Sequence, residues 1–409
     1  MEAETTLSPS RAAFAELTSG PGALASSLTA NGERELPIVF ILPGLPYGGS
    51  GGSHSVYQEV KGLRGLGIPA QIALPSWDWE RAQAAYPDAD EVFRTFTDSD
   101  DLAAVTADAA VISATHYRSV SLVRELREMR EDFLPAYYVQ DYEPFFTAPH
   151  VAEEAVASYT SVPGMVLFAK SHWLCNVVAE RHGLLVEKVE PSIDEGLFTP
   201  GGQMRRRSGP LRVVAMVRPR TTRRQPSSTV EVLERLHSEL GESVQITTFG
   251  CYADELGEIA PAARNTLDGH VGLLAREEVA ELLRRSDVFL DMSVYQAFGR
   301  TALEAMACGC TALVPQVGGA WEFIEQGENG LAIDTLDPHS AVEALTSLAE
   351  DREQLGRLQA GARATAAPYS IARAALSEYL MFERAHRARF GGPDHSPAAI
   401  GARSLLAHE

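Results

Sequence analysis

Short runs of apolar residues alternate with longer amphipathic stretches along most of the chain. This alternation is typical of parallel β-strands connected by crossover helices. The apolar runs that predict strands in the first half of the chain lie at 37–42, 70–74, 109–114, 136–140 and 164–168. Those in the second half lie at 211–217, 244–249, 270–273, 288–290 and 311–314. We therefore expect an α/β fold with two doubly wound, Rossmann-like parallel sheets.

A basic, loop-like stretch at 201–209 separates the two halves of this pattern. We place the domain boundary there, which gives a first Rossmann-like domain over 36–205 and a second over 206–368. The two ends of the chain are expected to be flexible, over 1–35 and over 391–409, where Gly, Pro, Ala and Ser are frequent.

The pattern becomes continuously helical after Asp337 and stays so to about Arg389. Pro368 is expected to break it, because proline lacks a backbone N–H and clashes with the preceding turn. This predicts a separate C-terminal helix over 369–390 that packs back on the first domain.

Composition narrows the class of protein. A formal net charge of −20 argues against a nucleic-acid partner, which would require clustered Lys and Arg. No run approaches the ~20 apolar residues of a membrane span, and the N-terminal segment lacks the apolar core of a signal peptide. We expect a cytoplasmic protein; peripheral membrane association and oligomeric state stay open.

The cysteines, which lack zinc-knuckle or disulfide-framework spacing, are Cys175, Cys251, Cys308 and Cys310.

The first predicted strand, at 37–42, runs into a glycine-rich loop and then a helix that Ser53 can cap and that continues to Leu66. The glycines of the loop are Gly44, Gly48, Gly49, Gly51 and Gly52. Two Rossmann-like units in tandem place ligands in a crevice at the carboxyl ends of both sheets.

The segment 296–310 carries the most specific chemical signal. Gly299 permits close backbone approach, and the N–H groups of Arg300 and Thr301 at a helix start can bind a pyrophosphate oxygen. One turn later, Glu304 interrupts a strongly apolar run, and a buried carboxylate requires a partner.

This segment resembles the signature of retaining family 4 glycosyltransferases of the GT-B fold, in which two acidic residues lie eight positions apart around a Phe-Gly turn. The matching residues are Phe298, Gly299, Leu303, Glu304, Ala305, Met306, Ala307, Cys308 and Gly309. The resemblance implies a nucleotide-sugar donor, with Phe298 in the donor site and Glu304 accepting hydrogen bonds from the ribose hydroxyls. Gln296 replaces the usual first acid, so we expect it to hydrogen-bond a sugar hydroxyl and count it among the catalytic residues.

The same resemblance extends from about 37 to 331. Arg218 and Arg223 follow the strand at 211–217 in the places of the family's basic pair, which clamps the donor diphosphate; Arg224 is an alternative to Arg223. Gly272 follows a strand whose end faces the nucleotide base. Gly48 and Gly49 occupy the loop that approaches the donor and the acceptor.

The stretch 139–144, Val-Gln-Asp-Tyr-Glu-Pro, is similar to a subgroup that transfers rhamnose from dTDP-rhamnose during surface polysaccharide synthesis. It implies a catalytic Asp141 that contacts the donor sugar or the acceptor hydroxyl, with Glu143 on the acceptor beside it. His116, after the strand at 109–114, is a further candidate acceptor contact.

No cluster of His, Asp and Glu has metal-ligand spacing, so we expect no metal and no cofactor beyond the nucleotide-sugar co-substrate. The best hypothesis is a retaining transferase of L-rhamnose, or a similar sugar, to a glycan or glycoconjugate hydroxyl. Alternatives are a transferase on a small natural-product acceptor and a noncatalytic sugar-nucleotide-binding protein. A dehydrogenase is disfavoured because the early glycines form no clean G-x-G-x-x-G motif.

Overall fold

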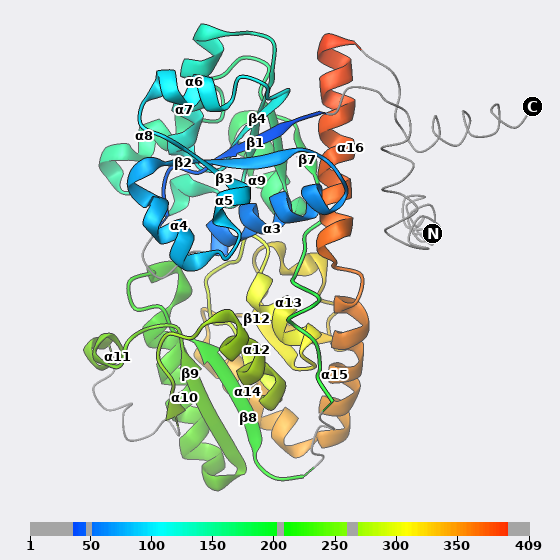
Figure 1. The fold of residues 1–409 in the computed structure, drawn as a ribbon. Helices are drawn as coiled ribbons and strands as arrows, with labels where there is room; N and C mark the ends of the chain where they lie inside the picture. Colours follow the sequence, from blue (N-terminus) through cyan, green and yellow to red (C-terminus); the bar gives the residue numbers. More distant parts are fainter. Residues whose placement is uncertain (1–35, 46–50, 203–207, 260–268, 392–409) are drawn as a thin grey trace, which may run out of the picture. The chain divides into compact units, whose positions relative to one another are not determined.

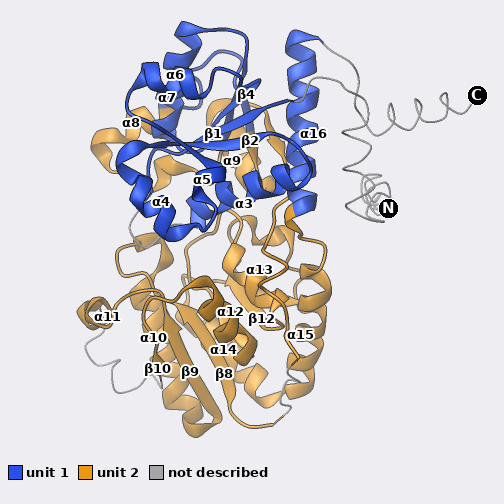
Figure 2. Ribbon diagram, in the orientation of Figure 1, with its two compact units in different colours: residues 1–138, 157–167, 372–409 blue, residues 139–156, 168–371 orange. Residues whose placement is uncertain are grey.

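The computed structural model describes residues 36–45, 51–202, 208–259 and 269–391. The expected flexible end at 1–35, all of the expected tail 391–409 except Gly391, the loop glycines Gly48 and Gly49, and the expected domain boundary at 205/206 lie outside these residues. The chain divides into two compact units (Figure 2). Unit 1 contains the described residues through Tyr138, Ala157–Leu167 and those from Ala372 onward; unit 2 contains Val139–Val156 and Phe168–Ile371.

The first sheet has seven strands in the order β3-β2-β1-β4-β5-β6-β7. β1 pairs in parallel with both β2 and β4, so the direction of winding changes between β1 and β4. The strands are β1 Ile38–Ile41, β2 Ala70–Pro75, β3 Phe93–Phe96, β4 Val111–Ala114, β5 Leu134–Tyr138, β6 Val166–Ala169 and β7 Val186–Lys188.

The second sheet has six strands in the order β10-β9-β8-β11-β12-β13, again with a reversal beside its first strand. Its pairs are parallel. The strands are β8 Leu211–Met216, β9 Val244–Phe249, β10 Gly269–His270, β11 Val288–Leu290, β12 Thr311–Pro315 and β13 Gly330–Ile333. In both sheets the first six strands follow the doubly wound order that the alternation of apolar and amphipathic segments predicts.

Helices connect these strands (Figure 1). Those before β8 are α3 Gly51–Gly65, α4 Trp79–Ala85, α5 Ala89–Val92, α6 Ser99–Val105, α7 Tyr117–Met129, α8 Ala152–Ala157 and α9 His172–His182. Those after β8 are α10 Pro226–Leu240, α11 Ala253–Ile259, α12 Arg276–Arg285, α13 Arg300–Ala307, α14 Pro338–Glu350, α15 Arg352–Ala366 and α16 Ile371–Phe390. Short 3₁₀ turns that matter below are η2 Glu143–Phe145, η4 Thr222–Arg224 and η7 Gly319–Glu322.

Each face of the second sheet has its own buried core, because alternate strand residues point to opposite faces. Val213 and Ala215 of β8 pack into a cluster with residues of α10 and α14. Val214 packs into the other cluster, which includes Leu303 and Met306 of α13. The apolar residues of the 296–310 segment thus fix α13 against the sheet.

The helix α16, red in Figure 1, contributes to the core of unit 1. Phe382 of α16 packs edge-on against Phe40 of β1, with ring centroids 6.3 Å apart. Both rings are fully buried. The last helix is therefore part of the hydrophobic core around the first strand.

Three details of the expected pattern are wrong. Ser53 lies inside α3, because Gly51 and Gly52 already adopt helical geometry ahead of it, so it is not the cap. The helical stretch after Asp337 breaks twice, at Asp351 as well as near Pro368. The strands β3, β7 and β13 were not expected. Among the described residues, no helix combines the length and apolar character that crossing a membrane requires.

Candidate functional site

The carboxyl ends of β8 and β11 lie side by side in the second sheet, since Ala215 pairs with Leu290 in parallel register. This is the point at which the strand order reverses, where open α/β sheets bind ligands. The chain leaves β8 into the basic loop 218–225. It leaves β11 into the loop 291–299, which leads to α13.

Hydrogen bonds join these two loops. The N–H of Val294 donates to the carbonyl of Arg223 at 2.8 Å. Gln225, in the left-handed region with φ 47°, donates through Nε2 to the carbonyls of Met292 at 2.7 Å and Thr335 at 3.1 Å. The two loops therefore form one connected rim above the strand ends.

Asp291 lies at the centre of a buried network in this rim. Its Oδ1 accepts hydrogen bonds from the N–H and the Oγ of Ser293, at 3.0 Å and 2.5 Å. Its Oδ2 accepts one from Nε2 of Gln296 at 2.6 Å and lies 3.8 Å from Nη1 of Arg224. The side-chain nitrogen of Gln296 is thus bound to a carboxylate of the protein itself.

Three arginine side chains gather beside this network. Burial lowers the pKa of Arg224, and the positive charges of Arg223 and Arg218 lower it further, while Asp291 opposes the shift. Arg218 is exposed and donates weakly from Nε to the sulfur of Met216 at 3.5 Å. Three clustered guanidinium groups outnumber the nearby carboxylates of Asp291 and Asp141, which favours an anionic ligand.

Arg223 is held by Asp141 and by aromatic rings. Its Nη2 lies 2.8 Å from Oδ2 of Asp141, and its Cζ lies 5.1 Å from the ring centroid of Phe146 and 5.4 Å from that of Tyr295. Burial raises the pKa of Asp141, and the charge of Arg223 opposes the rise. In the part of the chain that the structure describes, Arg223 Nη1 and the Tyr295 hydroxyl are buried without a hydrogen-bond partner.

The start of α13 has the backbone geometry that the sequence predicts. Gly299 precedes the helix with φ 97°, a conformation that a side chain would strain. The first turn of α13, with Arg300 and Thr301, leaves its N–H groups directed out of the helix end, where they favour an anion. Phe298 packs against Phe323 with ring centroids 5.3 Å apart, so its ring supports the loop from the core side.

Glu304 is buried in α13, as its apolar neighbours indicate. Burial raises the pKa of its carboxyl group, and the charges of Arg276 and Arg300 oppose the rise. Nη1 of Arg276 lies 3.8 Å from Oε1 of Glu304. That oxygen accepts no hydrogen bond from any described residue, so the carboxylate has unused acceptor capacity.

Sequence reasoning missed the residues that hold the loop 296–297 in place. Gly319 donates from its N–H to the carbonyl of Gln296 at 2.7 Å, and Gly318 forms a parallel bridge with Gln296. A Cβ atom on Gly319 would lie 2.0 Å from the carbonyl oxygen of Ala297. Ser171 Oγ donates to the same carbonyl at 2.5 Å. The Gly-Gly pair after the predicted strand 311–314 was the available signal.

Three other expected site residues, Gly272, Glu143 and His116, lie in the described part of the chain. Gly272 has φ 78°, and its carbonyl accepts a hydrogen bond from the N–H of Gly250 at 2.8 Å. Glu143 is buried at the start of η2. His116 lies in unit 1 and caps α7: its Nδ1 accepts a hydrogen bond from the N–H of Arg118 at 3.3 Å. Burial and the charge of Arg118 lower the pKa of His116 to about 4.

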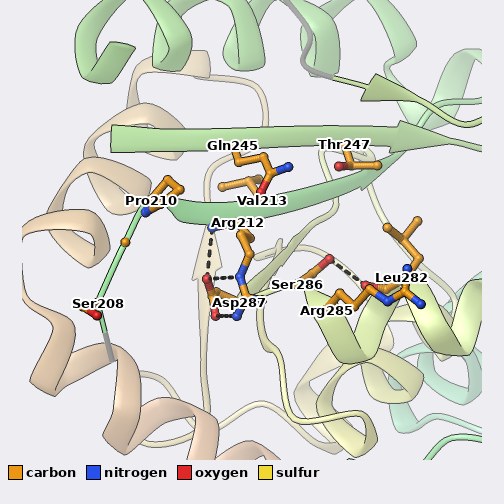
Figure 3. A pocket seen from close by; sticks show the side chains of 11 residues that line it. Ser208, Pro210, Arg212, Val213, Gln245, Thr247, Leu282, Arg285, Ser286 and Asp287 are labelled. Carbon is orange, nitrogen blue, oxygen red and sulfur yellow. Dashed lines mark hydrogen bonds and ion pairs between the residues drawn. The ribbon is translucent and has the colours of Figure 1, made fainter. Parts of the chain in front are cut away.

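A cavity of about 430 Å³ lies at the other end of β8 and β9, away from the loop 218–225 (Figure 3). Arg212 and Asp287 in its wall form a bidentate pair, with Nη2 to Oδ1 at 2.7 Å and Nε to Oδ2 at 3.0 Å. Arg212 and Asp287 neutralise each other, and Arg285, the other charged side chain of the wall, lies 3.3 Å from Glu281. No group of three or more His, Cys, Asp or Glu side chains in the described ranges is arranged to bind a metal ion.

Residues 208–365 match the family model described as Glycosyl transferases group 1. The chain is 31% identical over 227 residues to D-inositol 3-phosphate glycosyltransferase of Stackebrandtia nassauensis, which covers 51% of this chain and 51% of that protein. It is 31% identical over 200 residues to O-antigen biosynthesis protein RfbC of Myxococcus xanthus, which covers 48% of this chain and 15% of that protein. The chain thus matches about half or less of the length of these curated relatives.

Solved structures share the fold. HepE of Anabaena in complex with UDP and glucose superimposes with a TM-score of 0.70 at 16% identity, covering 86% of this chain and 100% of that one. Sucrose-phosphate synthase of Thermosynechococcus elongatus gives 0.72 at 15% identity, covering 87% and 100%. The expected α/β fold of the GT-B class is confirmed. The group 1 match and the names of the relatives support a transferase enzyme.

Proposed function

We propose that this protein is a glycosyltransferase that moves a sugar from a nucleoside-diphosphate donor to a hydroxyl group of an acceptor. The observation that carries the proposal is the edge of the second sheet at β8 and β11. There, three arginines lie beside the loop 291–299, which leads to the helix start at 299–301, and Glu304 follows one turn later. This edge lies within the segment that matches the group 1 family.

The chemistry of the edge supplies what departure of a nucleoside diphosphate requires. Negative charge develops on the β-phosphate as the sugar leaves, and preorganised cations and N–H groups stabilise it without a metal. We assign Arg218 and the first turn of α13 to the diphosphate, because Arg218 is exposed while Arg223 is paired with Asp141. Glu304, with an oxygen that lacks a hydrogen bond among the described residues, is assigned to the ribose hydroxyls.

The sugar and its acceptor are proposed from the sequence and from the named relatives. The stretch 139–144 favours L-rhamnose from dTDP-rhamnose, and Asp141, buried against Arg223, is the group we assign to a sugar or acceptor hydroxyl. Similarity to RfbC, named for O-antigen biosynthesis, favours a glycan acceptor. Similarity to a D-inositol 3-phosphate glycosyltransferase favours a small polar acceptor as the second candidate. A cytoplasmic location belongs to the same proposal, since the spacing of the four cysteines is not that of a disulfide framework.

The family resemblance further implies retention of the donor's anomeric configuration. The test is a transfer assay with dTDP-, UDP- and GDP-sugars and glycan or inositol-phosphate acceptors, followed by NMR of the new glycosidic bond. Release of nucleoside diphosphate with a new bond of retained configuration supports the proposal. An inverted product contradicts the retaining mechanism, and the absence of transfer from every donor contradicts the function.

Arg218→Ala tests the assigned diphosphate contact. We expect kcat to fall about 100-fold, the equivalent of about 3 kcal/mol of transition-state stabilisation, with little change in melting temperature. Arg220→Ala is the matched control, since Arg220 lies in the same loop, is exposed, and forms an ion pair with Glu255 at 3.1 Å. Equal kcat values for the two variants would assign the diphosphate to Arg223 or Arg224 instead.

A further inference from the structure

Two buried aspartates flank β11, and their hydrogen-bond partners differ. Asp287, immediately before the strand, is 3% exposed and forms two hydrogen bonds with the guanidinium group of Arg212. Asp291, immediately after the strand, is 8% exposed and is bound mainly by neutral donors from Ser293 and Gln296. Its paired cation, Arg224, lies at 3.8 Å, beyond hydrogen-bond distance.

A buried carboxylate is stable when a cation forms direct hydrogen bonds to it, as Arg212 does for Asp287. Asp291 lacks that arrangement, although Arg224 lies only 3.8 Å away. Its two oxygens are instead used to orient Ser293 and the amide of Gln296, while Arg224 is attracted without being bound. The hydrogen bonds from Ser293 and Gln296 stabilise a structural carboxylate as well, but the 3.8 Å separation leaves the guanidinium donors of Arg224 available to a ligand.

We propose that Asp291 is a positioning residue of the transfer reaction. Its carboxylate fixes the amide of Gln296 in one orientation and holds the guanidinium group of Arg224 at the edge where the donor diphosphate binds. This inference rests on the proposed glycosyltransferase function. Asp291 acts through these two side chains and has no contact with the reacting atoms itself.

The negative charge of Asp291 allows an experiment to distinguish a positioning role from a purely structural one. Asp291 adds negative charge beside the diphosphate site, so its removal strengthens the attraction for a nucleoside diphosphate. Its removal also releases Arg224 and Gln296 from their fixed orientations, which raises the barrier of the transfer step. Asp291→Asn should therefore lower kcat without lowering the affinity for a nucleoside diphosphate. If Asp291 only supported the structure, the substitution would lower both.

The experiment uses the full chain with UDP and dTDP as calorimetric probes and the most active donor in steady-state kinetics. Asp291→Asn should lower kcat about tenfold or more, with a Kd for the diphosphate that is unchanged or lower. The double variant Asp291→Asn, Gln296→Glu exchanges the carboxylate and the amide between the two positions. It should recover part of the lost kcat, while Gln296→Glu alone, with two carboxylates in contact, should not.

The matched control is Asp287→Asn at the other end of β11. It removes the partner of Arg212 and should lower the melting temperature while kcat stays unchanged. Ser293→Ala keeps the charge of Asp291 and removes one hydrogen bond to it; a smaller loss of kcat is expected, and this variant decides the question if Asp291→Asn does not fold.

The inference is overturned if the wild-type protein transfers sugar and Asp291→Asn, or Ser293→Ala in its place, keeps its kcat. It is also overturned if diphosphate affinity falls in step with kcat, or if the exchanged pair recovers nothing. A wild-type protein that binds no nucleoside diphosphate and transfers no sugar overturns the proposed function, and the role of Asp291 with it. The state of the wild type thus distinguishes the two failures.

Discussion

Glu304 is a charged side chain inside an otherwise apolar helix face, and the free energy of that placement is unfavourable without a ligand. Burial raises the pKa of its carboxyl group, and Arg276 at 3.8 Å compensates only in part. A group whose pKa is raised on folding contributes stability below its unfolded value and loses that contribution as pH rises. Ionisation of this carboxyl group as pH rises therefore destabilises the ligand-free protein.

Glu304→Gln should raise the melting temperature of the ligand-free protein at pH 7.5 by roughly 1 to 3 °C, because the amide carries no charge to desolvate. The same change should weaken binding of a nucleoside diphosphate about tenfold, through loss of charged acceptance of the ribose hydroxyls. Thermal melts with and without UDP measure both effects. A second melt at pH 5 is the control, where the difference between the two proteins should shrink. A lower melting temperature with unchanged affinity would make Glu304 a structural residue.

Apart from the family resemblance, which named Arg218, Arg223 and Gln296, the sequence indicated the candidate site through a few local features. Glu304 stands out because an acid within an apolar run requires a partner, and Gly299 because a turn precedes a helix. Asp291 gives no such signal, since aspartates are frequent where strands end. The network it forms with Ser293 and Gln296 depends on side-chain orientations that spacing along the chain does not determine.

At the level of elements, most of the strands that the sequence predicts are buried, although the predicted edge strand β10 is only half-buried. β1, β4 and β12 are buried at every position and give continuous apolar runs. The missed strands β3 and β7 lie at the two edges of the first sheet, where Arg94 and Glu187 are exposed and interrupt the pattern. The extra helix break is a capping effect: the carboxylate of Asp351 accepts a hydrogen bond from the N–H of Gln354 at 2.8 Å.

The helix α7 depends on a histidine cap, which makes its start sensitive to acid. Nδ1 of His116 accepts a hydrogen bond from the helix, and burial lowers the pKa of the ring to about 4. A pKa that is lowered on folding gives stability that is fully present above the unfolded value near 6.5 and is lost as pH falls toward about 4. Protonation also places a positive charge at a helix N-terminus, where the dipole opposes it.

His116→Asn should therefore reduce the acid sensitivity of the protein. Asparagine also caps helices but does not ionise in this range. Between pH 7 and pH 5 the wild type should lose about 2 kcal/mol of unfolding free energy through this group, and the variant should not. Urea unfolding at both pH values measures the difference, and His150→Asn, at an exposed histidine, is the control. Parallel pH dependence in the wild type and His116→Asn would exclude the cap as the acid-sensitive group.

The contacts of Gly319 and Ser171 that hold the loop 296–297 in place can be tested with one substitution. Gly319→Ala places a Cβ atom 2.0 Å from the carbonyl oxygen of Ala297, so the loop must move. We expect a destabilisation of about 1–3 kcal/mol and weaker binding of a nucleoside diphosphate, since the displaced loop carries Gln296 and leads to α13. Calorimetry and thermal melts measure the two effects.

Gly356→Ala is the matched control, because nothing lies within 4 Å of its added Cβ atom in α15 and alanine favours a helix interior. It should stabilise the protein slightly and leave binding unchanged. Normal diphosphate affinity in Gly319→Ala would show that the position of the loop 296–297 does not control the donor site.

For the whole molecule, the alternation of apolar runs and amphipathic segments was sufficient to predict two doubly wound sheets, because each βαβ unit repeats the same pattern. The acceptor was not predictable in this way, since loops rather than the regular helices and strands bind it. The net charge of −20 gives a further constraint. A strongly acidic protein repels a nucleoside diphosphate at long range, so binding depends on the local cations at 218–224.

The last prediction is that the protein binds UDP or dTDP without a divalent ion. Arg218, Arg223 and Arg224 lie close enough for their charges to interact, and α13 directs its first N–H groups out of the helix end. Within the described ranges, no cluster of three or more His, Cys, Asp or Glu side chains offers a metal site. These fixed charges can neutralise a diphosphate directly, and raising the salt concentration should weaken binding.

Calorimetry in EDTA and in magnesium should give dissociation constants that agree within about twofold, and a diphosphate at 100 times its Kd should stabilise the native state by about 2.7 kcal/mol in either buffer. Arg218→Ala should reduce the affinity in both buffers alike, because the contact it removes does not involve a metal. Orthophosphate serves as the control ligand, since it carries charge but lacks the ribose that Glu304 is assigned to bind. Binding that is detectable only with magnesium or manganese would contradict the electrostatic account of the site, because the arginines and the helix start would then be insufficient to hold the diphosphate.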